Sequence, residues 1–305
     1  MHDPINSPVN LLVRFLEQEK AGGQSHAWIS PEARAVLRAM VLARRQSVAN
    51  AARTMTSPPL AGRAAAAPTA PPSPAPTSPK AAFRIDAPAD SERMRQLEHV
   101  QSEILICPHY RALIERGALR DTMVFAAGHP HSPLMFIGEA PGAEEERRGE
   151  PFVGRAGQML TRIVQSMGLE RGQVYISNLV KYRPAIPGGA QGDKNRKPEP
   201  AEMAAALPHL LKEISIVQPK AIVALGGTAA EGLLGEPLAI TRVRGCFRDF
   251  HGIPLMPTFH PSYLLRNAGL EERRKLWEDI LQVMELLGIP ISEKQRKFFL
   301  MGEGS

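Results

Sequence analysis

Residues 134–157 contain the first side chains that could do chemistry. Residues 134–137 form a short apolar run, which is typical of a strand buried on both faces of a parallel sheet. The run ends at residues 138–142, Gly-Glu-Ala-Pro-Gly, where two glycines and a proline disfavour both strand and helix. Ligands of open α/β sheets bind beyond the carboxyl ends of the strands, so Glu139 in this turn indicates a site. A loop shaped only for chain reversal is the alternative.

A second loop and two further strand ends supply the other candidate side chains. Residues 155–167 have the pattern of a helix, so residues 151–154, Pro-Phe-Val-Gly, must form another loop over the same strand end. Asn178 ends a second predicted strand, and His260 follows a third and precedes Pro261. A carboxylate, an aromatic ring, a carboxamide and an imidazole are therefore expected at one edge of the sheet.

These motifs, in this order, resemble the uracil-DNA glycosylase superfamily. The series is Gly-Glu-Ala-Pro-Gly at 138–142, Pro-Phe-Val-Gly at 151–154, Asn-Leu-Val-Lys at 178–181 and His-Pro-Ser at 260–262. The pattern is most similar to family 4, which usually carries an iron–sulfur cluster. The resemblance implies a three-layer αβα fold with a central, mainly parallel four-stranded sheet. It also implies excision of uracil from DNA by hydrolysis of the N-glycosidic bond, which leaves an abasic site.

The resemblance gives each side chain a role. Phe152 would stack on the uracil after it has left the duplex. Asn178 would read the pyrimidine edge, because a carboxamide offers both a donor and an acceptor. His260 would donate to O2 of the departing base, where negative charge gathers. Each residue also has a purely structural alternative. Phe152 could be an ordinary core residue, Asn178 a turn or cap residue at a strand end, and His260 a histidine that is only packed there.

Two carboxylates are candidates for handling water. A carboxylate beside the sugar favours its oxocarbenium-like state and can orient or deprotonate water. Other branches of the superfamily have an aspartate where this chain has Ala140, so Glu139 is the first choice and Glu145 the second. Either could instead hold the loop by accepting backbone N–H bonds. Asn195 resembles a further family asparagine that helps to order water.

DNA contacts are expected from the segment after the histidine and from surrounding cations. Ser262 could donate to a phosphate, and Leu264 could enter the gap left by the flipped base; the alternative is that Leu264 and Leu265 pack inside the protein. The basic residues around the loops would bind phosphates without reading sequence. They are Lys181, Arg183, Lys194, Arg196, Lys197, Arg242, Arg244 and Arg266.

The family's cluster positions are mostly not cysteine here. They map to Ile104, Cys107, Tyr182 and Ala206, of which only Cys107 is a thiol. An iron–sulfur cluster needs four ligands. We therefore expect no cluster, no other metal and no cofactor, and we expect these four positions to meet in space, with packed side chains filling the void.

The elements that must position these residues alternate between strand and helix. This alternation indicates a parallel sheet covered on both faces. A further strand is expected at 122–125 and a hairpin at 244–253. Strands are expected at 134–138, 174–178, 221–225 and 254–259, and helices at 92–105, 110–116, 155–167, 201–217, 228–234 and 270–287.

Composition sets the wider limits. The chain has 305 residues and a net charge of +6, which favours a polyanionic partner, here uracil-containing DNA. Its two distant cysteines suit a reducing cytosol, and no window approaches the length of a membrane span. We expect a cytoplasmic monomer. Residues 1–56 form an N-terminal helical extension, 57–90 a disordered linker rich in Pro, Ala and Ser, 91–290 the glycosylase-like domain and 291–305 a tail.

Two other functions stay open at this level. The pocket could accept another deaminated base such as hypoxanthine, although Asn178 favours uracil. The chain could also be a DNA-binding paralogue that has lost catalysis, in which case Glu139 or His260 would be displaced from the site.

Overall fold

The computed structural model describes residues 91–188, 191–266 and 269–300. The chain divides into two compact units, Met1–Ser78 and Pro79–Ser305, and every described residue belongs to the second. The expected N-terminal extension at 1–56 and linker at 57–90 lie outside the described residues. Within the described residues, no helix is long and apolar enough to span a membrane.

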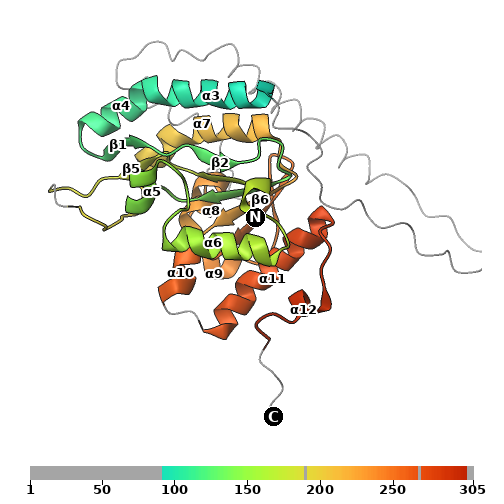
Figure 1. Cartoon of the computed structure of the whole chain (residues 1–305). Helices are drawn as coiled ribbons and strands as arrows, with labels where there is room; N and C mark the ends of the chain where they lie inside the picture. The colour runs from blue at the N-terminus through green and yellow to red at the C-terminus, as the bar shows by residue number, and fades with distance from the viewer. Residues whose placement is uncertain (1–90, 189–190, 267–268, 301–305) are drawn as a thin grey trace, which may run out of the picture. The chain divides into compact units, whose positions relative to one another are not determined.

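A six-stranded sheet lies at the centre of the described unit (Figure 1). Its order is β2 (Ala126–Gly128), β4 (Tyr175–Asn178), β3 (Leu134–Gly138), β6 (Ala221–Leu225), β8 (Ile253–Thr258) and β7 (Arg248–Phe250). The inner strands β4, β3, β6 and β8 are parallel, and the edge strands β2 and β7 pair antiparallel. The expected four parallel strands are confirmed, and two short antiparallel strands extend the sheet beyond them.

Helices cover both faces of the sheet, which confirms the three-layer fold. Figure 1 shows α3 and α7 on one side of the strands and α6, α10 and α11 on the other. On the first face lie α3 (Ser91–Ile106), α4 (Pro108–Glu115), α7 (Pro200–Val217) and α8 (Gly227–Leu234). On the second lie α6 (Arg155–Ser166), α10 (Pro261–Arg266) and α11 (Leu270–Leu287). The shorter helices are α5 (Ala143–Arg148), η2 (Arg171–Gln173), α9 (Ile240–Val243) and α12 (Glu293–Arg296).

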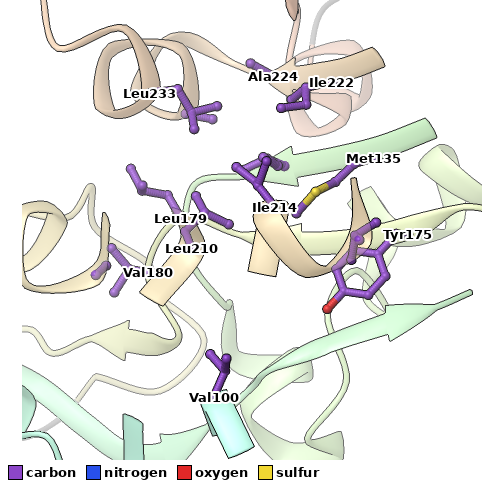
Figure 2. Packing of buried hydrophobic residues seen from close by; sticks show 14 of the residues in the cluster. Val100, Met135, Tyr175, Leu179, Val180, Leu210, Ile214, Ile222, Ala224 and Leu233 are labelled. Carbon is purple, nitrogen blue, oxygen red and sulfur yellow. The ribbon is translucent and has the colours of Figure 1, made fainter. Parts of the chain in front are cut away.

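The apolar run of β3 is uninterrupted because the strand is buried on both faces. Met135 and Ile137 pack into the core beneath α3, α4, α7 and α8, whereas Leu134 and Phe136 pack into the core beneath α6 and α11. Figure 2 shows the first core, where Met135 and Ile222 of the sheet face Ile214 of α7. Successive strand residues point to opposite faces, so a strand between two helical layers needs apolar side chains at every position.

The strand expected at 122–125 is wrong in its position. The chain there leaves β1 (Leu119–Met123), which pairs with β5 (Tyr182–Pro184) in a separate two-stranded sheet, and then enters β2 of the main sheet. Val124 lies between the two strands, and its N–H donates to Lys181 O at 2.8 Å. The bounds of a short strand depend on the strand with which it pairs, and a local stretch of sequence does not show which strand that is.

Candidate active site

The candidate site lies at the carboxyl edge of the four parallel strands. Gly138 at the end of β3 pairs in register with Asn178 at the end of β4. Leu225 at the end of β6 pairs with Thr258 at the end of β8. Because these strands are parallel neighbours, the loops that follow them emerge side by side.

Phe152 and Asn178 lie against the same glycine. A methyl group at position 138 would stand 2.4 Å from Asn178 Oδ1 and 2.4 Å from Phe152 Cζ, which is too close for real atoms. Phe152 is buried and has a backbone φ of +53°, a left-handed conformation that is strained for an aromatic residue. Gly138 therefore makes room for a ring and a carboxamide that are held next to each other.

The His260 ring faces Phe152, with the two ring centroids 5.8 Å apart and the planes tilted by 32°. His260 Nδ1 accepts the backbone N–H of Ser262 at 3.1 Å and lies 2.7 Å from the Ser262 hydroxyl. A backbone N–H can only donate, so Nδ1 is unprotonated and the ring proton resides on Nε2. Burial, aided by the Arg266 charge, lowers the pKa of His260 to about 4. At neutral pH the ring is uncharged and keeps a donor at Nε2.

Glu139 directly follows Gly138 and is half-buried. Burial raises the pKa of its carboxyl, while the Thr228 hydroxyl and the Lys197 charge partly oppose that rise. Thr228 belongs to the first turn of α8, just after β6, and a methyl group at Gly226 would stand 3.0 Å from His260 Cβ. The carboxylate thus lies beside the β6 loop that also supports the histidine.

Glu145 holds two loops together. Its Oε2 accepts the N–H of Gly142 at 3.1 Å, and its Oε1 accepts the N–H of Gly154 at 3.1 Å. Both oxygens are therefore used on backbone donors that flank Glu139 and Phe152. This is the loop-holding alternative, so Glu145 is not counted among the groups that act on water.

Asn195 lies beside the same turn. A methyl group at Gly142 would stand 3.0 Å from Asn195 Nδ2, and Asn195 Oδ1 accepts the Nε–H of Arg183 at 3.0 Å. Arg183 is buried and also pairs with Glu146 at 2.9 Å. Ala140, next to Glu139, is half-buried and packs against the first core. The long loop before Asn195 is thereby fastened to the glycine-rich turn.

Comparison with known proteins identifies the family. The model of the uracil DNA glycosylase superfamily matches residues 125–281, which include every strand end described above. The chain belongs to the uracil-DNA glycosylase superfamily.

Individual members give the same result. A type-4 uracil-DNA glycosylase of Thermotoga maritima is 45% identical over 163 residues, which cover 53% of this chain and 81% of the relative. One from Sulfurisphaera tokodaii is 37% identical over 207 residues, covering 65% of this chain and 87% of the relative. One from Archaeoglobus fulgidus is 30% identical over 203 residues, covering 64% of this chain and 95% of the relative. The sequence resemblance to this superfamily and the fold expected from it are confirmed.

Two of the expected DNA-binding cations are structural instead. Lys181 is fully buried in an ion pair with the equally buried Glu213, and its Nζ lies 2.5 Å from Ser177 Oγ. Arg196 pairs with buried Glu202 and also donates to the carbonyls of Ala118 and Ala185. The prediction that Lys181 contacts DNA is wrong, and the donors of Arg196 are used inside the protein. The sequence shows that both residues are basic, but it does not show that they pair with buried carboxylates.

The structure places Leu264 inside the protein, which is the packing alternative, and its entry into DNA stays a prediction. Leu264 is buried and belongs to the core beneath α6 and α11. Its neighbours Tyr263 and Arg266 are exposed, because α10 turns one side inward and leaves the other in solvent. Ser262 is half-buried, and its Oγ lies 3.2 Å from Arg266 Nη2. The His-Pro-Ser motif lies after β8 as expected, but α10 turns Leu264 inward and Tyr263 outward.

Sequence reading missed Thr228 and the second role of Ser262. Thr228 follows two glycines at the end of a buried strand, and this Gly-Gly-Thr signal could have revealed it. Ser262 was assigned to phosphate, whereas its backbone N–H also fixes the proton of His260. A serine two residues after a histidine is placed to make such a local bond.

The residues at the superfamily's cluster positions do not fit an iron–sulfur cluster. Ile104, Tyr182 and Ala206 are buried in the first core, and Cys107 packs against it. The Tyr182 ring lies 4.9 Å from the ring of Tyr110, which in turn lies 5.8 Å from His209 on α7. One thiol among apolar and aromatic side chains cannot supply four ligands. We therefore assign no step of the reaction to an iron–sulfur cluster.

Proposed function

We propose that this protein is a DNA glycosylase that excises uracil and leaves an abasic site. The observation that carries the proposal is the meeting of Phe152 and Asn178 at Gly138, with the His260 ring 5.8 Å from the Phe152 ring and Glu139 next in the chain. These side chains come from four loops spread over more than a hundred positions of the sequence. Packing of a core does not require this combination of groups at one strand edge, whereas recognition and release of a base does.

Base recognition comes first. A uracil turned out of the stack lies against the Phe152 ring, and the Asn178 carboxamide pairs with its O4 and N3–H. Cytosine presents the opposite pattern of donor and acceptor at this edge, so Asn178 rejects it. Asn178 is 2% exposed, and a wrong base would leave its buried amide unpaired.

Bond cleavage follows. The bond between C1′ and N1 breaks with its electron pair on uracil, and the Nε2–H of neutral His260 donates to O2, where the charge collects. An ionised Glu139 favours the cationic sugar and orients water, whose oxygen bonds to C1′ while a proton passes to the carboxylate. The raised pKa of Glu139 suits a group that must accept this proton.

The phosphate contacts are assigned to half-buried Ser262 and to three exposed basic residues. Ser262 and Arg266 follow the histidine directly, and Lys194 and Arg242 are exposed basic residues. Such contacts position DNA without reading its sequence and weaken as salt rises. A monomeric state, a cytoplasmic location and the lack of an iron–sulfur cluster stay predictions. Iron at cluster stoichiometry in the purified protein would contradict the last of these.

The test is release of uracil from a single-stranded and a double-stranded oligonucleotide. We expect free uracil from the unmodified protein, and loss of most excision in Asn178→Ala and His260→Ala with salt-sensitive DNA binding retained. Full activity in either variant would count against the assignment. An oligonucleotide carrying hypoxanthine examines the wider base range, and binding without any released base would indicate an inactive paralogue.

A further inference from the structure

The loop that carries Phe152 holds this residue in a backbone conformation that a phenylalanine rarely adopts. Phe152 has a φ of +53°, and its buried ring lies against Gly138. A residue in this left-handed region keeps its conformation only where the surrounding structure fixes the backbone around it. The contacts that fix the loop on either side of Phe152 therefore decide where the ring lies.

After Phe152, the fixing contacts come from α5 and α6. Glu145 of α5 accepts the N–H of Gly154, two residues further along the chain. Gly157 of α6 lies so close to the loop that a methyl group there would stand 1.8 Å from Phe152 O. Both contacts lie at Phe152 itself or on the side of the loop that follows it.

Before Phe152, the backbone is held by Arg171, the first residue of η2. Its Nη2 donates to Pro151 O at 2.6 Å, across 20 positions of the sequence. The same nitrogen pairs with Glu150 Oε1 at 3.2 Å. A hydrogen bond from a charged donor is shorter and stronger than one between neutral groups. The carbonyl directly before Phe152 is thus fixed by a cation from a distant segment.

The guanidinium of Arg171 takes this position at the expense of one of its own donors. Among the described residues, its Nη1 is buried and has no hydrogen-bond partner. A buried donor without a partner costs free energy. The Arg171 side chain is 22% exposed, so a turn toward solvent would satisfy that donor in water. The arrangement therefore serves the loop and not the hydrogen bonding of the arginine.

We propose that Arg171 is a positioning residue for Phe152, which sets the stacking ring in place before a base arrives; this role rests on the proposed function. A ring that is already in place loses little conformational freedom when uracil enters the pocket. Without Arg171 the peptide before Phe152 can rotate and the strained φ can relax, which moves the ring away from Gly138. Arg171 acts through Phe152 and not on the base.

Loss of Arg171 should separate entry of the base from binding of DNA. The phosphate contacts are assigned to other residues, so the affinity for DNA should be kept. Entry of uracil into the pocket follows DNA binding and requires the ring in its place. The defect should therefore appear in the maximal rate at saturating protein and not in the protein concentration that gives half of that rate.

The experiment measures single-turnover uracil release from one oligonucleotide over a range of protein concentrations. Arg171→Met removes the charged donor and keeps an unbranched side chain. It should lower the maximal rate by roughly 10- to 100-fold, which corresponds to the loss of one hydrogen bond from a charged group. The half-saturating concentration should change by less than about threefold, because the phosphate contacts remain.

The matched control is Arg274→Met. Arg274 of α11 is 19% exposed and pairs with Glu278, much as Arg171 pairs with Glu150. It also donates to backbone carbonyls, those of Arg296 and Phe298, neither of which is a site residue. Its maximal rate should stay within about threefold of that of the unmodified protein, since any cost falls on stability alone.

A double-mutant cycle with Phe152→Leu shows whether Arg171 acts through the ring. In the Phe152→Leu background, Arg171→Met should lower the maximal rate by less than about twofold further, because no ring is left to position. Two independent structural losses would multiply instead. Release is followed over hours so that slow rates can be read, and a thermal melt reports on folding. If Arg171→Met does not fold, Arg171→Lys, which keeps the charge, takes its place in the cycle.

Three results would overturn the inference. They are a maximal rate in Arg171→Met close to that of the unmodified protein, a loss no larger than that of Arg274→Met, or losses that multiply in the double variant. If the unmodified protein releases no uracil from any oligonucleotide, the proposed function itself fails. That outcome is distinct, because it is read before any variant is compared.

Discussion

At the scale of single residues, the site depends on groups whose ionisation is set by burial. His260 has its pKa lowered to about 4 and donates from Nε2 as a neutral ring. Glu139 has its pKa raised, so its carboxylate accepts a proton more readily than an exposed glutamate does. The two shifts run in opposite directions for one reason, which is that burial disfavours whichever form carries charge. His260 is therefore uncharged at neutral pH, as its donor role requires, and the Glu139 carboxylate is a stronger base than that of an exposed glutamate.

The pH dependence of excision follows from Glu139. The carboxylate must be ionised, so activity is present above its folded pKa and falls as pH drops through that value. Because the pKa of Glu139 is raised, this fall begins at a higher pH than for an ordinary glutamate. Single-turnover rates between pH 4 and 8 should show this limb, and Glu139→Gln should lower the rate and remove the limb. A limb that persists in Glu139→Gln belongs to another group.

Gly138 should tolerate no side chain. In Gly138→Ala the new methyl would stand 2.4 Å from Asn178 Oδ1 and from Phe152 Cζ, so the carboxamide or the ring must move. A displacement of this kind in a catalytic constellation costs about 100-fold in rate. Uracil release should fall by that factor while salt-sensitive DNA binding is kept. Near-normal release would mean that these two side chains are not fixed where the structure places them.

At the scale of elements, the loops after β3 are held by one carboxylate. Glu145 on α5 accepts the N–H groups of Gly142 and Gly154, one in each loop that carries a site residue. Neither loop has a regular hydrogen-bond ladder to fix it, so the two bonds to a charged acceptor take that place. The loop that bears Phe152 is thus positioned through the side chain of Glu145.

Glu145→Ala should loosen this connection. Each hydrogen bond to a charged group contributes about 1.5–3 kcal/mol, so the variant should unfold at lower urea and lose about tenfold or more in excision. Within the described part of the chain, its neighbour Glu144 pairs with the exposed Arg147 and Arg148, and Glu144→Ala serves as the control. Equal behaviour of the two variants would remove Glu145 from this positioning role.

At the scale of the whole molecule, buried ion pairs join the layers around the sheet. Asp279 on α11 is fully buried, pairs with Arg244 at 2.5 Å and accepts the hydroxyl of Thr258 at 2.6 Å. Thr258 ends β8, two residues before His260. On the opposite face, Lys181 in the segment after β4 pairs with Glu213 of α7, which also accepts the hydroxyl of Ser177 of β4. Both pairs lie behind strand ends that carry site residues.

Loss of Asp279 should be costly. Asp279→Ala leaves the largely buried Arg244 without its partner, and breaking such a pair costs about 3–5 kcal/mol. The control is Glu271→Ala, which removes an exposed pair with Lys275 on the same helix and should cost far less, because solvent screens that pair. Urea denaturation of both variants compares them directly. A similar small cost in each would show that Asp279 does not stabilise this junction.

The sequence by itself determined the parallel strands, the loops that follow them and the residue types at their ends. These follow from local rules, since apolar runs of strand length, Gly-Pro turns and ordered motifs are visible without contacts. It could not determine which charged or apolar residue is buried. Lys181 and Arg196 were read as solvent cations and Leu264 as a DNA contact, because burial depends on partners distant in the chain.

Tertiary structure alone decided the remaining features. Glu213 lies 32 positions after Lys181 and neutralises it, Glu145 reaches across nine residues to Gly154, and α10 turns Leu264 inward and Tyr263 outward. The proton of His260 is likewise fixed by a bond that only the folded turn provides. Residue types set which chemistry is available, and the packing of distant segments sets which side chains are free to perform it.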